Sequence, residues 1–288
     1  GHTGFKGAWL CLILHKLGAK IVGYSLKPKR KSLYNQLKVK KIINKSYYNN
    51  IKNYSALRKS ISKFNPDIIF HLAAQPLVIE SYKKPVETFS TNIIGTANLL
   101  DSIRNNLKLK EKSLIIITTD KVYDTSIKKS YAETDKLGAS DPYSTSKACC
   151  EFICESYIKS FKNLKKMLVT VRAGNVIGGG DYSKNRLVPD ILNAVRNKKK
   201  LIIRNPNHIR PWQHVFEPLS GYILLAQKIY EGSLKKKLPN WNFGPNDNSC
   251  KSVNFITKKF NQKLSLNIKY LKTIYVKKNS FLKLNNYK

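Results

Sequence analysis

Three glycines in the first seven residues constrain this chain more than any other feature. Residues 1–7 read Gly-His-Thr-Gly-Phe-Lys-Gly, with the spacing G-x-x-G-x-x-G. In such a turn, Gly1 and Gly4 let the backbone approach the pyrophosphate of a dinucleotide, and Gly7 lets the next helix pack close to the sheet. A hydrophobic strand normally precedes the turn, so we expect the sequence to be a fragment whose first strand is missing.

The residues after the turn continue the pattern of a mononucleotide-binding unit. Residues 5–17 carry apolar side chains at helical spacing, which predicts a helix, and Gly18 is placed to end it. Residues 20–25 then read as a buried strand. Turn, helix and strand in this order make half of such a unit.

Helices and strands continue to alternate through residue 173. We predict helices over 55–64 and 86–103 and from Tyr143, and a basic loop with a short helix over 27–45. Apolar runs predict strands over 67–72, 113–118 and 168–173. Apolar strands alternating with helices predict an α/β fold with a doubly wound parallel sheet of the Rossmann type. We expect a dinucleotide-binding domain over 1–173, and a smaller, mainly substrate-binding region over 174–288 that partly returns to the first domain.

The net charge of +36 does not by itself predict nucleic-acid binding. Of the 53 basic residues only eight are arginines, and the lysines are scattered among Asn, Ile and Tyr. Proteins that bind nucleic acids specifically favour clustered arginine with interleaved aromatic residues. We therefore expect no specific nucleic-acid partner, although a basic field would attract a doubly charged sugar nucleotide.

The five cysteines favour neither a metal site nor a disulfide framework. Cys149, Cys150 and Cys154 fall on one predicted helix, where they point in different directions, and no C-x-x-C accompanies them. An odd number of thiols suits a reducing cytoplasm, where we expect the protein. No run of eighteen apolar residues occurs, so we expect no membrane span.

The residues with the clearest chemical implication are Thr118-Thr-Asp-Lys-Val-Tyr123 and Tyr143-Ser-Thr-Ser-Lys147. A tyrosine and a lysine four residues apart on a helix lie on one face. The ammonium, together with a nicotinamide cation, would lower the pKa of the tyrosine. Tyr143 could then take a proton from a sugar hydroxyl while the same carbon loses hydride.

The sequence resembles the extended short-chain dehydrogenase/reductases (the NAD-dependent epimerase/dehydratase family), and among them the dehydratases of nucleotide sugars that act on CDP-glucose. The matching stretches run through nearly the whole chain. The narrowest, residues 175–181 and 210–215, favour the CDP-glucose branch. The others are residues 1–10, 71–78, 90–96, 118–124, 141–147, 172–174, 186–190 and 241–245.

The resemblance implies catalytic roles for five residues. Tyr143 would be the base at the 4-hydroxyl, Lys147 would hold the nicotinamide ribose, and Thr119 would bind the same hydroxyl. Asp120 would protonate the leaving 6-hydroxyl. Lys121 stands where the dTDP-glucose dehydratases have a glutamate base, so it would be either the C5 base, if its pKa is lowered, or a fixed charge that stabilises the enolate.

The resemblance also implies NAD as cofactor. A lysine at position 27, where NAD-dependent members usually carry an acid, leaves NADP as the alternative. The expected cofactor-binding residues, besides Tyr143 and Lys147, are Gly1, Thr3, Gly4, Phe5, Gly7, Ser25, Leu72, Ala73, Ala74, Gln75 and Thr91.

The substrate side follows from charge and from the resemblance. Asn175, Arg186 and Arg210 are candidates for the nucleotide diphosphate, since guanidinium groups suit bidentate contacts. We expect structural roles for His2, His71 and His214. The implied function is 4,6-dehydration of CDP-glucose by a homo-oligomer. The alternatives are a 4-epimerase, a dTDP- or GDP-sugar dehydratase, and an inactive sugar-nucleotide-binding protein.

Overall fold

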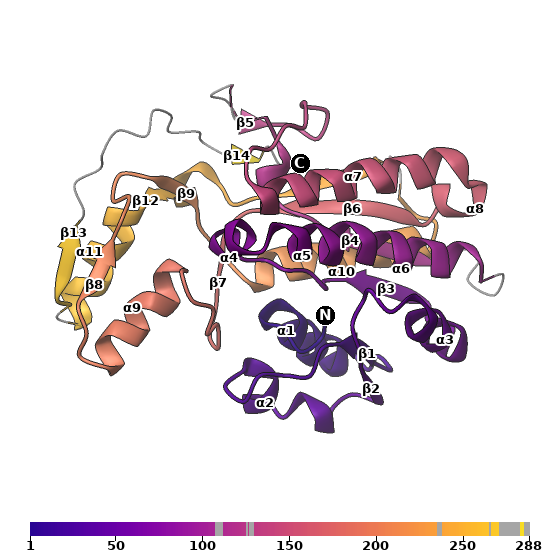
Figure 1. Cartoon of the computed structure of the whole chain (residues 1–288), viewed down its shortest axis with the longest axis horizontal. Coiled ribbons are helices and arrows are strands. Elements are labelled where there is room, and N and C mark those ends of the chain that lie inside the picture. The colour runs from indigo at the N-terminus through magenta and orange to yellow at the C-terminus, as the bar shows by residue number, and fades with distance from the viewer. Residues whose placement is uncertain are drawn as a thin grey trace.

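A four-stranded parallel sheet forms the centre of the molecule (Figure 1). The computed structural model describes residues 1–106, 112–124, 126, 130–234, 238–264, 266–270 and 283–284 of the 288-residue chain. In the sheet, Ile115 stands opposite both Phe70 and Val169. The strands, in spatial order, are β11 (Asn240–Phe243), β6 (Leu168–Ala173), β4 (Ser113–Ile117) and β3 (Ile68–His71). The prediction of a doubly wound parallel sheet is confirmed.

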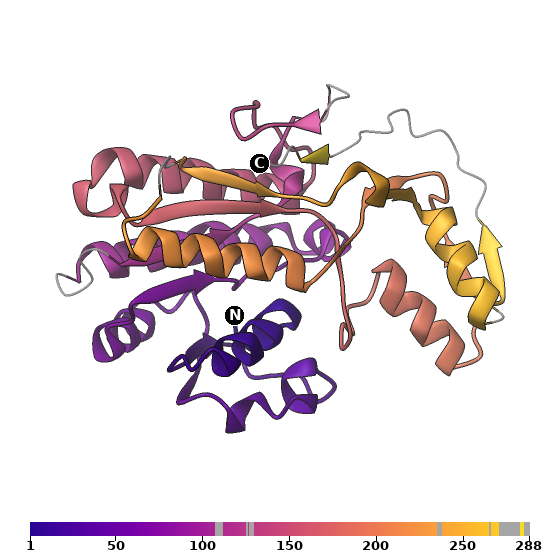
Figure 2. The same cartoon turned by 180° about the vertical axis from the view of Figure 1, so that it is seen from behind.

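Helices cover both faces of this sheet, which explains why β4 is buried at every position and apolar after Ser113. Ile116 packs into a core with Leu100 and Leu168, on the face of the sheet that α6 covers, which is in front in Figure 1. Its neighbour Ile115 packs with Leu219 on the other side, where Figure 2 shows α10. Successive strand residues point to opposite faces, so a strand buried on both sides reads as one apolar run.

The long helices of the first 173 residues follow the predicted pattern with one refinement, and two short helices, α4 and α8, were not predicted. The helix predicted over 86–103 is built from three consecutive segments, the middle one π-helical. The helices are α1 (Phe5–Lys16), α3 (Tyr54–Phe64), α4 (Val78–Lys83), α5 (Pro85–Phe89), η2 (Ser90–Ile94), α6 (Gly95–Arg104), η4 (Asp120–Val122), α7 (Pro142–Ser160) and α8 (Lys162–Lys165).

A second, two-stranded sheet joins β1 (Val22–Ser25) to β2 (Lys45–Tyr48) in parallel. Among the described residues, β1 and β3 are not paired with each other, and the Gly1 nitrogen donates a hydrogen bond to the Tyr24 carbonyl at 2.6 Å. The predicted strand before Gly1 stays a prediction. In the basic segment 27–45, the short helix was predicted correctly as α2 (Leu33–Gln36), with η1 (Val39–Lys41) after it. Strand β2 was missed.

The chain beyond Ala173 builds a separate lobe and then returns to the sheet (Figure 1). Helix α10 (Phe216–Tyr230) packs on β4, and β11 pairs with β6, so both belong to the main body. The lobe itself contains β7 (Val176–Ile177), α9 (Leu187–Arg196), β8 (Leu201–Ile203), β9 (Ile209–Pro211), β10 (Gln213–His214), η5 (Asp247–Ser249), β12 (Cys250–Ser252), α11 (Val253–Leu264) and β13 (Ile268–Tyr270). Strand β5 (Ser130–Tyr131) pairs with β14 (Lys283–Leu284).

Candidate functional site

The glycine turn is a tight structure in which two of the glycines have no room for a side chain. A Cβ on Gly1 would lie 2.6 Å from the Ala73 nitrogen, in the loop after β3, and one on Gly7 would lie 2.2 Å from the Gly1 carbonyl oxygen. The absence of a side chain at Gly7 therefore lets α1 pack closely against the glycine turn. From the sequence we expected Gly7 to allow close packing against the sheet. Gly4 is exposed and adjoins the start of α1, where Phe5 follows.

The loop after β3 is held beside this turn by a buried asparagine. Asn92 accepts a hydrogen bond from the Gln75 backbone nitrogen at 2.8 Å, and its amide donates to Ser146 of α7 at 2.8 Å. It lies in π-helical η2, next to Thr91. Leu72, Ala73, Ala74 and Gln75 are thereby tied to the helix that carries Tyr143 and Lys147. The sequence analysis quoted this stretch only as a family match and gave Asn92 no role.

The end of β1 lies against the same turn. Thr3 shares a hydrogen bond with the Ser25 hydroxyl at 2.8 Å and donates another to the Leu26 carbonyl at 3.0 Å. His2 packs in the narrow space beside Gly23, where its ring leaves no room for a Cβ, and contacts Ser46 at 3.1 Å. The two predicted residues Thr3 and Ser25 are thus in direct contact, and His2 packs against the end of the turn as a structural residue would.

The first turns of α7 lie beside the carboxyl end of β4 and bring the predicted catalytic residues together. Asp141 caps the helix by accepting a hydrogen bond from the Ser144 backbone nitrogen at 3.0 Å, and Pro142 occupies its first turn. Tyr143 and Lys147 are both buried on the same side of α7. The Lys147 ammonium donates to the Ile117 carbonyl at 2.9 Å, which fixes it at the end of β4.

In the protein without a ligand, burial determines the pKa of Tyr143. Burial raises this pKa to about 12, and a hydrogen bond with Thr119 and the charge of Arg186 oppose the increase without reversing it. Burial of a phenol disfavours the charged phenolate. Activation of Tyr143 therefore depends on the charge that a bound ligand brings.

Asp120 and Lys121 lie beside Tyr143, immediately after β4. Burial raises the pKa of the Asp120 carboxyl, which accepts a hydrogen bond from Thr119 at 3.0 Å. Burial also lowers the pKa of Lys121, and Arg210 adds to this effect. A raised carboxyl pKa and a lowered amine pKa shift the two groups toward the roles of an acid and a base in the same site.

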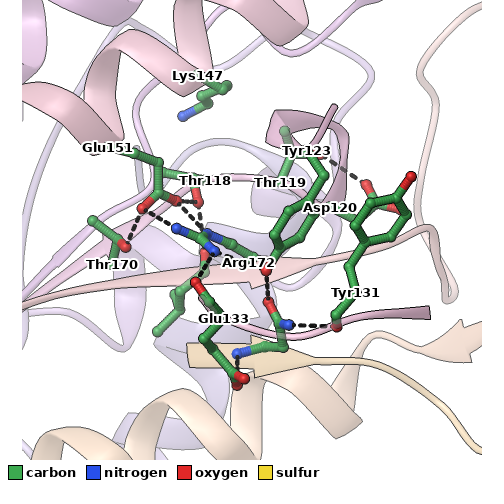
Figure 3. Close-up of polar contacts among 12 residues, drawn as sticks. Thr118, Thr119, Asp120, Tyr123, Tyr131, Glu133, Lys147, Glu151, Thr170 and Arg172 are labelled. Carbon is green, nitrogen blue, oxygen red and sulfur yellow. Dashed lines mark hydrogen bonds and ion pairs between the residues drawn. The ribbon is translucent and has the colours of Figure 1, made fainter. Parts of the chain in front are cut away.

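A buried ion pair anchors α7 one turn beyond Lys147 (Figure 3). Glu151 binds Arg172 of β6 through two hydrogen bonds, of 3.0 and 3.1 Å, and both side chains are almost completely buried. Glu151 also accepts a hydrogen bond from Thr118, next to Thr119. Arg172 in turn donates to the Tyr123 hydroxyl at 2.7 Å. This network was not predicted from the sequence, because it depends on residues from three distant segments.

The predicted substrate residues lie where the lobe meets the sheet. Arg186 precedes α9 and donates a hydrogen bond to Asp181 at 3.0 Å, while Arg210 is part of β9. Both arginines lower the pKa of Lys121 and so lie within electrostatic reach of it. Asn175 is partly buried between β6 and β7, at the same edge.

The histidines predicted to be structural make contacts within the fold. His71 is buried and hydrogen-bonds Thr96 at 3.0 Å, and exposed His214 accepts a hydrogen bond from the Phe216 nitrogen at 3.3 Å. All five cysteines are present as thiols. Within the described ranges, no three metal-ligating side chains converge, and none of the helices has the length and apolarity needed to cross a bilayer.

Comparison with known proteins adds a family and a set of relatives. Residues 1–234 match the family described as GDP-mannose 4,6 dehydratase. The chain is 47% identical over 268 residues to the CDP-glucose 4,6-dehydratase of Salmonella typhimurium, a match that covers 90% of this chain and 73% of that protein. It is 30% identical over 243 residues to the dTDP-D-glucose 4,6-dehydratase of Dictyostelium discoideum, covering 79% of this chain and 54% of that protein.

Solved structures show the same fold at lower identity. The dTDP-glucose 4,6-dehydratase of Bacillus anthracis, in complex with NAD, superposes with a TM-score of 0.78 at 22% identity, covering 94% of this chain and 82% of that one. The UDP-glucose 4-epimerase of Thermotoga maritima gives 0.80 at 20% identity, with coverage of 100% and 88%.

Proposed function

The chain belongs to the GDP-mannose 4,6-dehydratase family, and from that membership we propose that it converts CDP-glucose to CDP-4-keto-6-deoxyglucose. The reaction class, 4,6-dehydration of a nucleotide sugar, follows from the family. The observation that carries the proposal is the place of Asp120, buried at the end of β4 between Thr119 and Lys121. Tyr143 and Lys147 support oxidation of the sugar. Asp120 as an acid and Lys121 as an amine then allow water to be eliminated from the oxidised sugar.

The turn at residues 1–7 fits the cofactor that this family implies. Because Gly1 has no side chain, the turn lies directly against the loop of Leu72 and Ala73. Helix α1 starts directly after the turn, so the backbone N–H groups at its start are available for a pyrophosphate. We propose that these residues, with Thr3, Ser25 and Lys147, hold NAD. When bound, NAD accepts the hydrogen of C4 with its electron pair and later returns it. Binding titrations with NAD and NADP measure the preference, and a strong preference for NADP would refute this choice.

The proposed reaction begins with oxidation at C4. Tyr143 takes the proton of the 4-hydroxyl, and Thr119 hydrogen-bonds the same oxygen. The resulting ketone acidifies the C5 proton, which Lys121 removes; the lowered pKa of Lys121 supports this role over that of a fixed charge. As the C5 electron pair forms the C5–C6 double bond, the C6–O bond breaks, and Asp120 protonates the departing hydroxyl to give water. Return of the C4 hydrogen to C6, and of a proton to C5, completes the product.

Isotope tracing tests the function directly. From CDP-glucose deuterated at C4, we expect CDP-4-keto-6-deoxyglucose with the deuterium at C6, as read by mass spectrometry and NMR of the product. Recovery of CDP-galactose with all its oxygen would identify a 4-epimerase. Conversion of a dTDP- or GDP-sugar in preference to CDP-glucose would identify another dehydratase, and absence of any turnover would favour the inactive binding protein.

Asp120→Asn separates the two stages of the reaction. The amide keeps the size of the carboxyl but cannot deliver a proton to the 6-hydroxyl, so product formation should slow by about 10²–10⁴-fold. Quenched single-turnover samples should still contain a 4-keto hexose that retains its 6-oxygen. Asp67→Asn, at the exposed start of β3, is the matched control and should leave turnover unchanged. Normal product formation by Asp120→Asn would remove Asp120 from the mechanism.

We further propose a homo-oligomer in the cytoplasm. Tyr82 of α4, Val86 of α5 and Phe152 of α7 expose more than half of their surface, on helices that pack against one another. A run of exposed apolar side chains on one layer is typical of a protein interface. Sedimentation velocity measures the assembly, and a monomer at all concentrations would contradict the proposal. The five free cysteines support a reducing compartment.

A further inference from the structure

One cation in the site is left without a role by this mechanism. Lys6 lies in the first turn of α1, and its ammonium sits 5.9 Å from the centre of the Tyr222 ring. Within the described part of the chain, this ammonium makes no hydrogen bond and no ion pair, and its contact is the Tyr222 ring. Burial and then the charge of Arg186 lower the pKa of Lys6 to about 8, with Asp120 opposing them.

The charges around Lys6 leave an excess of positive charge in the site. Lys6 and Arg186 come from segments about 180 residues apart in the sequence, yet the charge of Arg186 contributes to the lowered pKa of Lys6. Lys121, Lys147 and Arg210 add three more basic groups, and the acids that act on these groups include Asp120, Asp141 and Asp181, of which Asp181 is paired with Arg186. Basic groups that outnumber the acids beside them favour a ligand that supplies negative charge.

The surroundings of Lys6 also favour a bound ligand. Tyr222 of α10 is completely buried, and its hydroxyl has no hydrogen-bond partner among the described residues. Asp120 and Tyr143 both influence this hydroxyl, so it lies close to the reacting end of the site. An unpartnered donor and an unpaired ammonium together favour an oxygen-rich ligand group.

We propose that Lys6 binds the diphosphate of the sugar nucleotide, together with Arg186. The glycine turn then serves both ligands: its backbone faces the pyrophosphate of the cofactor, and the side chain of its sixth residue reaches the substrate. This inference rests on the proposed function, because it takes a nucleoside-diphosphate sugar as substrate.

Lys6→Met tests the proposal, since methionine keeps most of the length of lysine without its charge. A hydrogen bond to a charged group stabilises binding enough to predict a KM for CDP-glucose that is roughly 10- to 100-fold higher, with a much smaller change in kcat. Lys6→Arg should recover most of the loss. Lys16→Met, on the exposed last turn of α1, is the matched control and should leave KM unchanged.

Calorimetry separates this inference from the proposed function, because it requires no turnover. Lys6→Met should weaken binding of CDP by roughly 10- to 100-fold, change binding of CMP far less, and leave binding of NAD and the melting temperature unchanged. Weaker NAD binding with unchanged CDP binding would assign Lys6 to the cofactor and overturn the proposal. A lower kcat with a shifted pH profile and an unchanged KM would instead show that Lys6 acts through Asp120, which also overturns it.

Discussion

Tyr143→Phe should lower dehydratase turnover by about 10²–10⁴-fold and leave no 4-keto sugar in quenched samples. The substitution removes only the phenol oxygen from a buried ring, so the space that the ring fills is unchanged. What is lost is the group that takes the proton of the 4-hydroxyl, and general-base catalysis contributes a factor of this size. Because oxidation is the first step, Asp120→Asn and Tyr143→Phe should differ in whether the 4-keto hexose accumulates.

The pH profile provides a second measurement of the same residue. The pKa of Tyr143 is raised to about 12 by burial, and the phenolate is the form that removes the proton. The turnover rate should therefore increase with pH in the alkaline part of the profile, and Tyr143→Phe should abolish that increase. Tyr230→Phe, at the exposed end of α10, is the control and should retain the profile. Turnover of Tyr143→Phe near the rate of the unaltered protein would assign the base to another residue.

Glu151→Gln should lower the free energy of unfolding by about 3–5 kcal/mol, the largest stability effect that we expect of a single substitution. It leaves the Arg172 guanidinium buried without a charged partner, and breaking a buried ion pair from one side has a cost of this order. Burial alone would lower the pKa of Arg172, but Glu151 and Tyr123 raise it above its ordinary value.

The same helix provides the control for this experiment. Glu155→Gln breaks an exposed ion pair with Lys159, one turn beyond Glu151, and should change the free energy of unfolding by no more than about 1 kcal/mol. Denaturant titration measures both variants. Equal decreases in the free energy of unfolding for Glu151→Gln and Glu155→Gln would show that the buried ion pair stabilises the protein no more than the exposed one. A double variant, Glu151→Leu with Arg172→Met, should recover part of the stability, because no buried charge then remains unpaired.

The sequence predicted the elements whose pattern is carried by neighbouring residues. Strands β4 and β6 are mainly apolar and buried at every position because both faces are covered, and such runs are visible without a structure. The start of α7 was predicted from Tyr143, and its cap, Asp141 followed by Pro142, is equally local. Strand β2 was missed because Lys45-Ser-Tyr-Tyr48 sits in a lysine-rich segment and is only partly buried.

The site was predictable to the extent that its residues occur in short motifs. Thr119, Asp120, Tyr143 and Lys147 were found in this way, and the fold brings them together. Asn92, Lys6 and the Glu151–Arg172 pair were not, because each depends on contacts between segments far apart in the sequence. The lowered pKa of Tyr143 beside a bound nicotinamide stays a prediction; the sequence did not reveal that burial raises this pKa in the protein alone, because it does not show how completely a side chain is buried.

The separation of the lobe from the sheet has a consequence for how such an enzyme can diversify. Asp120 lies in η4, just after β4, and Tyr143 and Lys147 lie on α7, whereas Arg186 and Arg210 belong to the lobe built after Ala173 (Figure 1). Selection could therefore change which nucleotide is accepted through mutations in the lobe, while the proton chemistry is inherited intact. A chimaera that exchanges the lobe between relatives should keep the reaction and change the base preference. Lys6 is the exception: it lies on the sheet side, so the two halves would not be fully independent.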